Sequence, residues 1–577
     1  MVKNKNSWLI YACFMIILIT NINLLSNYRT EIPELYNPEL VEIKAYYPSA
    51  LTSPLFTLDM LTNQLSTNFR ENICLEVKED LEAIGIGVNL NSSDWTYVTD
   101  QLLNRNEYDM FFVGLYAGIL FDPDWSHLFA ENGSLSACFG YDTSMDYNST
   151  YGTGLNQWYL EQGRLMMPPN STARINHYWE WQEYFMNEIL SYIPGFYALH
   201  FESMWSNLNG YNATEGLLKS LGKMSWSGSH LGQASTSEVV LTDWMWLNLN
   251  PLRHEDEVEV GNTYIKDALM DRLVYYDRDL NVYPHIISDW NHINDTHVRL
   301  TVRDGIKWQT DPDSLFPNEY LDARDVYFSL FSYKNLANIT KDWIDEIEII
   351  DDHTVDLFID ENISTITNDP YCSYLREFND MSVLPEHYLN QTQLADGITP
   401  NMTHSSWTKF NTQAFGTGPF ELSAYLDYDH TNLTLFNDSW WFNATVNNDP
   451  RLDFTQRFGD FSGGISDLRI MVYYDETEIH NEFEAGRLDL IDISDNQTKK
   501  IEYSGNSNYD IQTKIRTTHT FWGINVRESR GTPMQSMDPC PLIPGMTVGL
   551  AVRKAIAHAI DKDSIASLYV GANGRSN

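Results

Sequence analysis

Segments with helical and with strand-like spacing of apolar residues alternate near the front of the chain, and this alternation limits the fold more than any other feature. Leu58–Val88 has helical spacing, a strand restarts at Val88–Leu90, and Asp94–Arg105 returns to helical spacing. Tyr108–Val113 is then a largely apolar run, typical of a strand that is buried on both faces. This order predicts an α/β lobe with a parallel or mixed sheet.

Size and charge narrow the class of protein. A chain of 577 residues is several times a typical domain, so we expect two or three lobes with ample cores. The 37 basic and 79 acidic residues give a net charge of −42, which would repel nucleic acids and anionic lipids. We expect a solvated acidic surface and no nucleic-acid partner. An acidic cleft for cationic solutes is the alternative.

The first 27 residues have the pattern of an export signal. Lys3 and Lys5 precede the apolar run Trp8–Ile19, and no small-x-small cleavage site is evident. The run is borderline for a spanning helix of about 20 residues. A cleaved signal peptide and an uncleaved amino-terminal membrane anchor are therefore both open. Either one predicts a protein at the extracellular face of the membrane.

The glycosylation acceptor pattern Asn-x-Ser/Thr supports export independently. It occurs throughout the chain, at Asn91, Asn132, Asn148, Asn170, Asn212, Asn294, Asn338, Asn362, Asn390, Asn401, Asn432, Asn437, Asn443 and Asn496. Their number and spread fit an exported glycoprotein.

Cysteine spacing excludes some chemistry and leaves other chemistry open. Apart from Cys13 the chain has four cysteines, and an even number outside the cell permits two disulfides with three connectivities. None of them has the close CxxC spacing of a zinc site. The sequence also lacks HExxH, GxSxG and GxxxxGK[ST] motifs. We expect no metal, no cofactor and no catalytic residues, and we interpret His519 and His558 as structural.

The rest of the chain continues the α/β pattern. Residues 220–237 are small and polar and predict a linker. Strands are expected at Val239–Leu249, Val298–Arg303, Thr354–Ile359, Ile465–Tyr474 and Thr517–Val526. Helices are expected at Ala173–Leu190, Ala323–Tyr333, which Asp322 could cap, Glu476–Ala485 and Val548–Leu568, the last in two pieces around Asp561.

Five phrases in the later part of the chain carry a family resemblance. They are LMDRLVYYD (269–277), RDGIKW (303–308), LDARDVYFSL (321–330), FGTGPF (415–420) and AVRKAIAHAIDKDSI (551–565). In this order they resemble the solute-binding proteins of peptide and nickel ABC importers. The resemblance implies a periplasmic-binding-protein-like α/β fold of type II. Such a fold has two lobes with mixed sheets around a ligand cleft, and one lobe carries an extra subdomain.

The order of the motifs differs from that family. Its carboxyl-terminal half should follow Ile565, but its counterpart lies in front, as DLEAIGIGVNL (80–90), YDMFFVG (108–114) and FDPDWSHLF (121–129). One explanation is circular permutation, with the original ends fused in the linker. The other is a fragment of a longer tandem protein.

Permutation predicts a particular division of the chain. Residues 28–219 form the second-lobe segment with its return to the first lobe, and 220–237 are the linker. Residues 238–517 form the first lobe with the extra subdomain, and 518–577 begin the second lobe.

The resemblance also places three segments at the ligand cleft. The first is the loop 116–124, with Tyr116, Ile119, Asp122 and Asp124. In peptide-binding relatives an aspartate four residues before a proline holds the α-amino group of the peptide. Ile119 occupies that position here, which puts a free-peptide specificity in doubt. Asp122 and Asp124 either compensate or serve the turn alone.

The other two segments supply Phe521 and Trp522, before Gly523, and Trp246 and Asn248, before the Asn250–Pro251 turn. Aromatic rings there could stack on a sugar or cap an apolar side chain. The alternative is that Phe521 and Trp522 are ordinary core residues.

Together these features predict a monomeric extracytoplasmic solute-binding protein of an ABC importer. It would capture an oligopeptide or oligosaccharide and deliver it to the permease subunits, without catalysis. A surface receptor or structural glycoprotein that keeps the fold without transport is the alternative. A secreted glycoside hydrolase, with a carboxylate pair such as Asp122 and Asp124, is a third.

Overall fold

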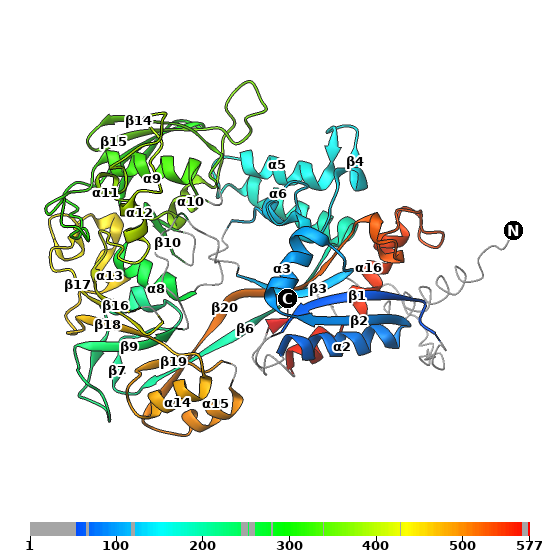
Figure 1. The fold of residues 1–577 in the computed structure, drawn as a ribbon. Helices are drawn as coiled ribbons and strands as arrows, with labels where there is room; N and C mark the ends of the chain where they lie inside the picture. Colours follow the sequence, from blue (N-terminus) through cyan, green and yellow to red (C-terminus); the bar gives the residue numbers. More distant parts are fainter. Residues whose placement is uncertain are drawn as a thin grey trace, which may run out of the picture.

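The computed structural model has two lobes joined by a pair of long strands (Figure 1). It describes residues 53–64, 69–116, 122–243, 252, 260–277, 281–337, 340–426, 428–494, 496–567 and 575–576. The front and the back of the chain meet in one lobe, called the second lobe below. The middle of the chain, about 207–508, forms the first lobe.

The second lobe is a sheet with helices on both faces. Its strands are β1 (Phe56–Asn63), β2 (Ile86–Ser93) and β3 (Met110–Tyr116), which are parallel, and the end of β20 (Tyr509–Ile524), which is antiparallel to β3. One face packs on α2 (Phe69–Ala83) and α16 (Val548–Ala559). The other packs on α5 (Leu155–Leu165) and α6 (Thr172–Tyr184). Shorter elements are α3 (Trp95–Asp100), α4 (Ser126–Phe129), α17 (Lys562–Ile565) and the pair β4 (Tyr147–Asn148) and β5 (Thr153–Gly154).

The predicted double burial of the strand around Phe111 is confirmed. Met110 and Phe112 point into the core beneath α2, whereas Phe111 and Val113 point into the core beneath α6. Successive side chains of a strand face opposite sides of its sheet, so an unbroken apolar run fits only a strand covered on both faces.

The first lobe combines its own part of the large sheet with an extra subdomain. Its sheet strands are β9 (Glu238–Asp243), β16 (Phe420–Leu426), β17 (His430–Leu435), β18 (Asp467–Val472) and β19 (Leu490–Asp492). The subdomain is a four-stranded sheet of order β12 (Ile287–Asn294), β13 (His297–Val302), β15 (Thr354–Ile359) and β14 (Ile344–Asp351). One large hydrophobic core serves both.

The helices of the first lobe are mostly short. They are α7 (Leu217–Leu221), α8 (Val260–Leu269), α9 (Ala323–Asn335), α10 (Tyr374–Asp380), α11 (Glu386–Leu389), α12 (Ser405–Phe410), α13 (Phe454–Phe458), α14 (Glu476–Glu484) and α15 (Gln497–Ser504). Two small antiparallel pairs complete it, namely β7 (Leu208–Asn209) with β8 (Ser225–Trp226), and β10 (Val274–Tyr276) with β11 (Val282–Pro284).

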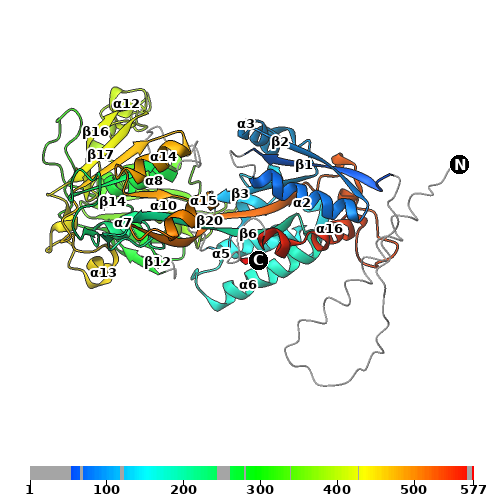
Figure 2. The ribbon, with the colours of Figure 1, turned by 90° about the horizontal axis from the view of Figure 1, so that it is seen from below.

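Two strands, β6 (Tyr192–Trp205) and β20, run through both lobes and are called the hinge strands below (Figures 1 and 2). They make the sheet continuous, in the order β16-β17-β18-β9-β19-β6-β20-β3-β1-β2, with β21 (Arg575–Ser576) also paired to β6. The antiparallel pairing of β6 and β20 shifts register between Ile515 and His519 and again before Phe521. Such irregularities bend a sheet locally, and this one lies where the chain passes between the lobes.

Several predicted elements are confirmed. Helix α9 begins with a capping box in which Asp322 and Asp325 satisfy each other's backbone N–H groups. Asp561 separates α16 from α17 and accepts a hydrogen bond from the Ser564 N–H at 2.9 Å. Gly486, which closes α14, has a φ of +74°, where glycine avoids the strain of a Cβ.

Two expectations differ from the structure. Residues 58–63, expected to be helical, belong to β1, because Leu58 and Met60 pack in the core while their backbone pairs with β2 and β3. Residues 220–237, expected to be a linker, dock on the first lobe. Leu221 and Met224 are 2% and 1% exposed.

The four described cysteines, Cys74, Cys138, Cys372 and Cys540, are buried and unpaired, so the permitted disulfides are not formed. The predicted signal or anchor lies outside the described residues. Within the described part of the chain, none of the helices is both long and apolar enough to cross a membrane.

The recurring motifs meet in a buried polar network. The Asp271 carboxylate accepts hydrogen bonds from His285, Thr417, Trp440 and Trp441 at 2.6–3.0 Å. Gln309, after RDGIKW, donates to the carbonyls of Gly418 and Phe420 in FGTGPF. Buried polar groups need such partners, so these motifs specify how segments far apart in the sequence dock.

Candidate ligand site between the lobes

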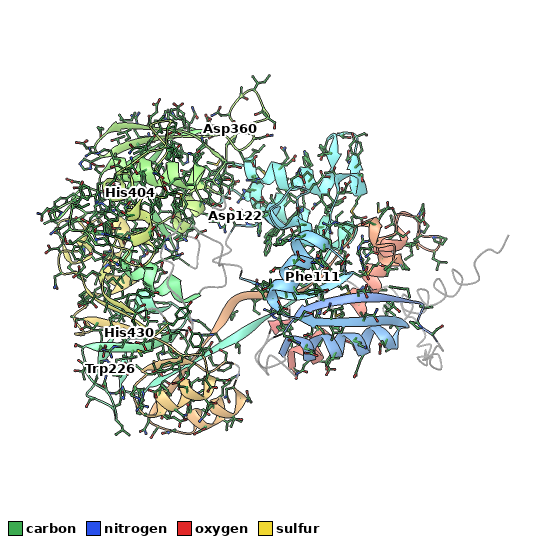
Figure 3. All side chains as sticks on the ribbon, viewed as in Figure 1. Phe111, Asp122, Trp226, Asp360, His404 and His430 are labelled. Atoms are coloured by element: carbon green, nitrogen blue, oxygen red, sulfur yellow. The ribbon has the colours of Figure 1, made fainter. Side chains whose placement is uncertain are left out.

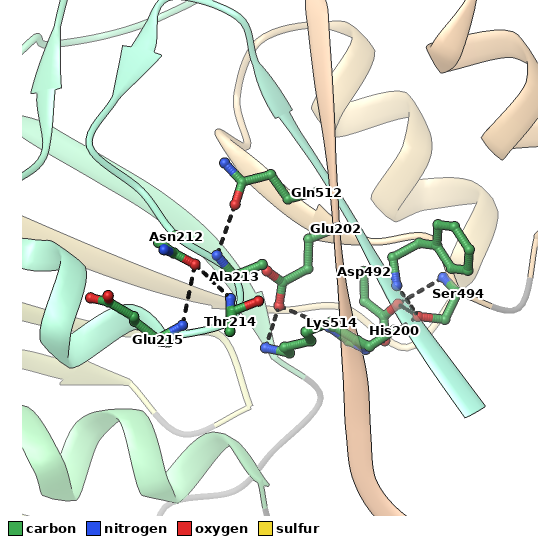
Figure 4. Close-up of polar contacts among 12 residues, drawn as sticks. His200, Glu202, Asn212, Ala213, Thr214, Glu215, Asp492, Ser494, Gln512 and Lys514 are labelled. Carbon is green, nitrogen blue, oxygen red and sulfur yellow. Dashed lines mark hydrogen bonds and ion pairs between the residues drawn. The ribbon is translucent and has the colours of Figure 1, made fainter. Parts of the chain in front are cut away.

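The hinge strands carry a polar cluster on the side of the first lobe, shown in Figure 4. The Glu202 carboxylate on β6 contacts Lys514 Nζ on β20 at 2.8 Å and His200 Nε2 at 2.8 Å. The Tyr211 hydroxyl donates to its second oxygen at 2.5 Å. Burial would raise the pKa of Glu202, but the His200 hydrogen bond and the Lys514 charge hold that pKa at about 2.

The same cluster ties the chain after β6 to β20. Gln512 accepts from the Ala213 N–H at 2.8 Å and donates to the Tyr211 carbonyl at 3.0 Å. His200 also contacts Asp492, the last residue of β19, at 3.4 Å, and Ser494, just after that strand, at 3.2 Å. The first-lobe end of the hinge strands is therefore held by several polar contacts to neighbouring segments.

At a second place the lobes contact each other directly through Asp122. Figure 3 shows Asp122 and Asp360 near the junction of the lobes. Asp122 pairs in a bidentate way with Arg174 of α6, at 2.7 and 3.1 Å, and Arg174 is 2% exposed. The Ser373 hydroxyl of the first lobe donates to Asp122 at 2.8 Å. Burial would raise the pKa of Asp122, but Arg174 holds it below its usual range.

Arg164, at the end of α5, makes a further contact with the first lobe. Its guanidinium lies 2.6 Å from Glu361 of the first lobe and 3.4 Å from Asp124 of its own lobe. Its carbonyl accepts the Cys372 N–H at 3.0 Å, and its guanidinium lies 5.2 Å from the centre of the Tyr371 ring. Burial raises the pKa of Glu361 to about 7, against the opposing effect of Arg164. The interlobe latch is defined here as Asp122, Arg164 and Arg174 with Glu361, Cys372 and Ser373.

Beside the latch, side chains of both lobes face each other. His127 of α4 keeps access to solvent. Desolvation of the ring by surrounding protein atoms lowers the pKa of His127, even though part of the side chain stays exposed. The Trp125 ring stacks on His127, with centroids 5.8 Å apart and planes 16° apart. From the first lobe, Tyr276 interacts electrostatically with Asp122 and Arg376.

Two surface hollows lie elsewhere. One of about 760 Å³ is lined by second-lobe residues of the segments 131–145 and 526–537, and one of about 260 Å³ by residues of β1, β2, α3 and residues 101–108. Neither is lined by a first-lobe residue, so movement of the lobes would close neither. We take the junction as the candidate site because side chains of the two lobes contact each other there.

The structure places some of the predicted site residues at the lobe junction and leaves others outside the described residues. Asp122 and Asp124 lie at the junction, but both carboxylates are held by arginines and by turn N–H groups. Tyr116 ends β3, and its side chain lies outside the described residues together with Ile119, Trp246 and Asn248.

Phe521 and Trp522 lie in the protein core and not at a cleft. They are 1% and 0% exposed and lie in separate cores on the two faces of the sheet. The Phe521 ring packs on Phe111 at 5.8 Å and the Trp522 ring on Phe112 at 5.0 Å. The reason is that β20 lies inside a sheet covered on both faces, so neither side of this stretch borders a cleft.

Sequence reasoning missed the latch residues Arg164, Arg174, Glu361 and Ser373. No local signal marks them, because each is an ordinary surface type whose partner lies far away in the chain. The sequence does not reveal which of the many acidic residues meet these arginines.

Two lobes joined by two hinge strands, with a second contact across the junction, define a two-lobed solute-binding fold. The sequence profile of the bacterial extracellular solute-binding proteins, family 5 Middle, matches residues 281–576, more than half of the chain. The chain belongs to this family, whose members are extracytoplasmic binding proteins rather than enzymes.

Among solved structures the chain is similar to NikZ from Campylobacter jejuni in complex with Ni(L-His), with 18% identity over 44% of this chain and 42% of that chain, at a TM-score of 0.31. It is similar to the oligopeptide-binding protein AppA from Bacillus subtilis in complex with a nonapeptide (17% identity, 44% and 43%, TM-score 0.31). A third is the mannohexaose-bound periplasmic oligopeptide-binding protein of Thermotoga maritima (15% identity, 44% and 40%, TM-score 0.31). The chain spans less than half the length of these structures. A search of curated protein sequences gives no match.

Proposed function

We propose that this protein captures an oligopeptide or oligosaccharide between its lobes and delivers it to the permease of an ABC importer. The observation that carries the proposal is the arrangement of hinge strands and interlobe latch around one junction. A solute that touches both lobes would favour the closed state by the difference in its affinity for the two states. The permease would recognise that closure.

The latch makes closure partly independent of solute. Ser373 and Glu361 contribute hydrogen-bonded or charged contacts to the second lobe, and these contacts would favour the closed form whether or not a solute is bound. A solute then needs to supply less free energy to hold it closed.

The solute is proposed to bind without the amine clamp of peptide-binding relatives. Ile119 stands at the clamp position, and the carboxylates of Asp122 and Asp124 are engaged by Arg174 and Arg164. A carboxylate already paired with a guanidinium gains little from an ammonium group, because both charges compete for the same oxygens. This favours oligosaccharides, or peptides gripped elsewhere, over free peptides held by their amino terminus.

We also propose that the chain is circularly permuted. β1–β3 precede the first lobe in the sequence and α16 follows it. In the structure β1–β3 form a sheet with β20, and α16 packs on a face of that sheet. The docked segment after β6 leads straight into β9. After removal of glycans, an intact mass well above 66.7 kDa for the protein from its own cells would favour the tandem alternative.

The proposal places the protein outside the cytoplasm, secreted or held by its amino-terminal segment, and monomeric. A thermal-shift screen against oligosaccharides, oligopeptides and Ni(L-His) tests the binding function. At 100 times the dissociation constant a solute should stabilise the protein by about 2.7 kcal/mol. If no class of solute raises the melting temperature, a receptor or structural role without transport is the better account.

A further inference from the structure

Acceptor sequences for N-glycosylation are more common in this chain than its composition explains. The chain has 49 asparagines and 84 serines and threonines, and fourteen Asn-x-Ser/Thr sequences is about twice the number expected by chance. Sequence alone does not tell which of them a glycosyltransferase can use. The structure separates them by the state of the asparagine amide.

Six of the asparagines share one geometry. In each, the Oδ1 atom accepts the backbone N–H of the Ser or Thr two residues later, at 2.9–3.1 Å, in Asn148, Asn212, Asn294, Asn362, Asn401 and Asn443. In three of them Oδ1 also accepts the Thr hydroxyl, from Thr296, Thr403 and Thr445. The Nδ2 atoms of all six have no hydrogen-bond partner among the described residues. The turn therefore fixes the carbonyl side of the amide and leaves the nitrogen available.

Four of these six side chains are exposed, namely Asn212, Asn294, Asn362 and Asn443. Two of them lie in the extra subdomain, Asn294 at the β12–β13 turn and Asn362 after β15. The other two lie in the rest of the first lobe, Asn212 after β7 and Asn443 directly after the short helix at 440–442. A glycan attached there would extend into solvent. Asn148 and Asn401 are half-buried, so a glycan would meet neighbouring side chains.

Other acceptor sequences are blocked by the fold. Asn432 lies in β17, paired on both sides with β16 and β18, and its Oδ1 atom is buried. Asn496 caps α15, with Oδ1 accepting the Lys499 N–H at 3.0 Å and Nδ2 donating to Glu476 at 2.9 Å. Asn390 donates from Nδ2 to Glu386 at 2.7 Å. Glycosylation of these residues would require a strand or a cap to come apart.

We propose that Asn212, Asn294, Asn362 and Asn443 are N-glycosylation sites, and that Asn432 and Asn496 are not. The donor is an oligosaccharide on a lipid-linked phosphate, supplied by a membrane transferase. Nδ2 forms a bond to the anomeric carbon, the bond from that carbon to the phosphate oxygen breaks, and the oxygen keeps the electron pair. Nδ2 loses one proton to a base of the transferase, and nothing is oxidised or reduced.

This inference depends on the export that the proposed function includes, but not on solute binding. The test is glycopeptide mass spectrometry on the full chain purified from the surface fraction of its own cells. Glycan masses on Asn212, Asn294, Asn362 and Asn443, with Asn432 and Asn496 bare, are the expected result. Any other pattern overturns the proposal. Recovery from the surface fraction establishes export, and the thermal-shift screen on the same sample tests solute binding separately.

A pair of variants tests the chemistry at one site. Thr445→Ala removes the hydroxyl that acceptor recognition requires, so the glycan mass on Asn443 should disappear. Thr445→Ser keeps a hydroxyl, and that glycan mass should persist. Both side chains are small and Thr445 is exposed, so both variants should fold. Equal occupancy of Asn443 in the two variants, whether high or absent, would contradict the assignment.

Discussion

At the scale of single residues, Asp122 serves two functions that mutation can separate. With Arg174 it forms a buried ion pair inside the second lobe, and with Ser373 it forms a hydrogen bond between the lobes. Asp122→Asn breaks the buried pair and leaves Arg174 uncompensated, which should lower the free energy of unfolding by about 3–5 kcal/mol. Urea unfolding measures this loss.

Ser373→Ala should act only between the lobes. Losing one hydrogen bond to a carboxylate costs about 1.5–3 kcal/mol, and the loss should appear as weaker solute affinity because closure becomes less favourable. Ser405→Ala, an exposed serine of the same lobe, is the matched control. Equal affinities for the two variants would show that Ser373 does not contribute to closure.

Glu361 gives the latch a pH dependence of definite sign. Its pKa in the folded protein is raised from 4.5 to about 7, so the native state binds more protons than the unfolded state between these values. Its contribution to stability is therefore complete below pH 4.5 and is lost as the pH rises through 7. The shift corresponds to at most about 3 kcal/mol.

Thermal unfolding between pH 4.5 and 8 checks this effect. Glu361→Gln should flatten the fall in melting temperature that the wild type shows as the pH rises. Glu79→Gln, an exposed glutamate on α2, should leave the wild-type profile unchanged. A wild-type profile that Glu361→Gln does not alter would mean that burial does not control this carboxyl.

At the scale of elements, the hinge strands respond to acid in the opposite direction. The pKa of Glu202 is lowered from 4.5 to about 2, so its contribution is present above pH 4.5 and is lost as the pH falls through 2. Glu202→Gln should remove up to about 3 kcal/mol at pH 7 and make urea unfolding less dependent on pH between 4.5 and 2. An acid profile as steep as that of the wild type would exclude the anchoring role of the cluster.

The same scale shows what sequence can predict. Elements with a strong local signal were predictable, such as α9 with its Asp322 cap and β3 with its unbroken apolar run. Residues 58–63 were not, because the helical pattern of α2 begins soon afterwards and only pairing with β2 and β3 makes this segment a strand. For Phe521 and Trp522 the cleft and the core both stayed open, because sequence does not show that helices cover both faces of that sheet.

The candidate site was the least predictable part. The resemblance placed Asp122 in a cleft loop, with a role in the turn alone as the alternative, but its engagement by Arg174 and Ser373 depends on residues 52 and 251 positions away. Contacts of such long range follow from the fold and not from local pattern. The family motifs were more informative about the fold than about the site, because they form the buried network around Asp271.

At the scale of the whole molecule, the fold joins sequence-distant parts into one hinged body. The front strands β1–β3 share a sheet with β20 and a core with α16, so neither end of the described chain completes the second lobe alone. On the proposed function, solute capture at the junction would depend on the movement of two intact lobes about β6 and β20. Dyes on introduced surface cysteines can measure that movement. The four described native cysteines are buried, and buried thiols react slowly with labels, so they would not compete.

The most direct test is energy transfer between dyes on the two lobes. Tyr147 of the second lobe and Tyr320 of the first lobe are 61% and 55% exposed, and both would be changed to cysteine in a Cys13→Ser background. If the protein is a hinged binding protein, transfer efficiency rises to a plateau as a stabilising solute is added, with the same midpoint as binding. A solute that saturates the protein while the efficiency stays constant would contradict closure around a ligand.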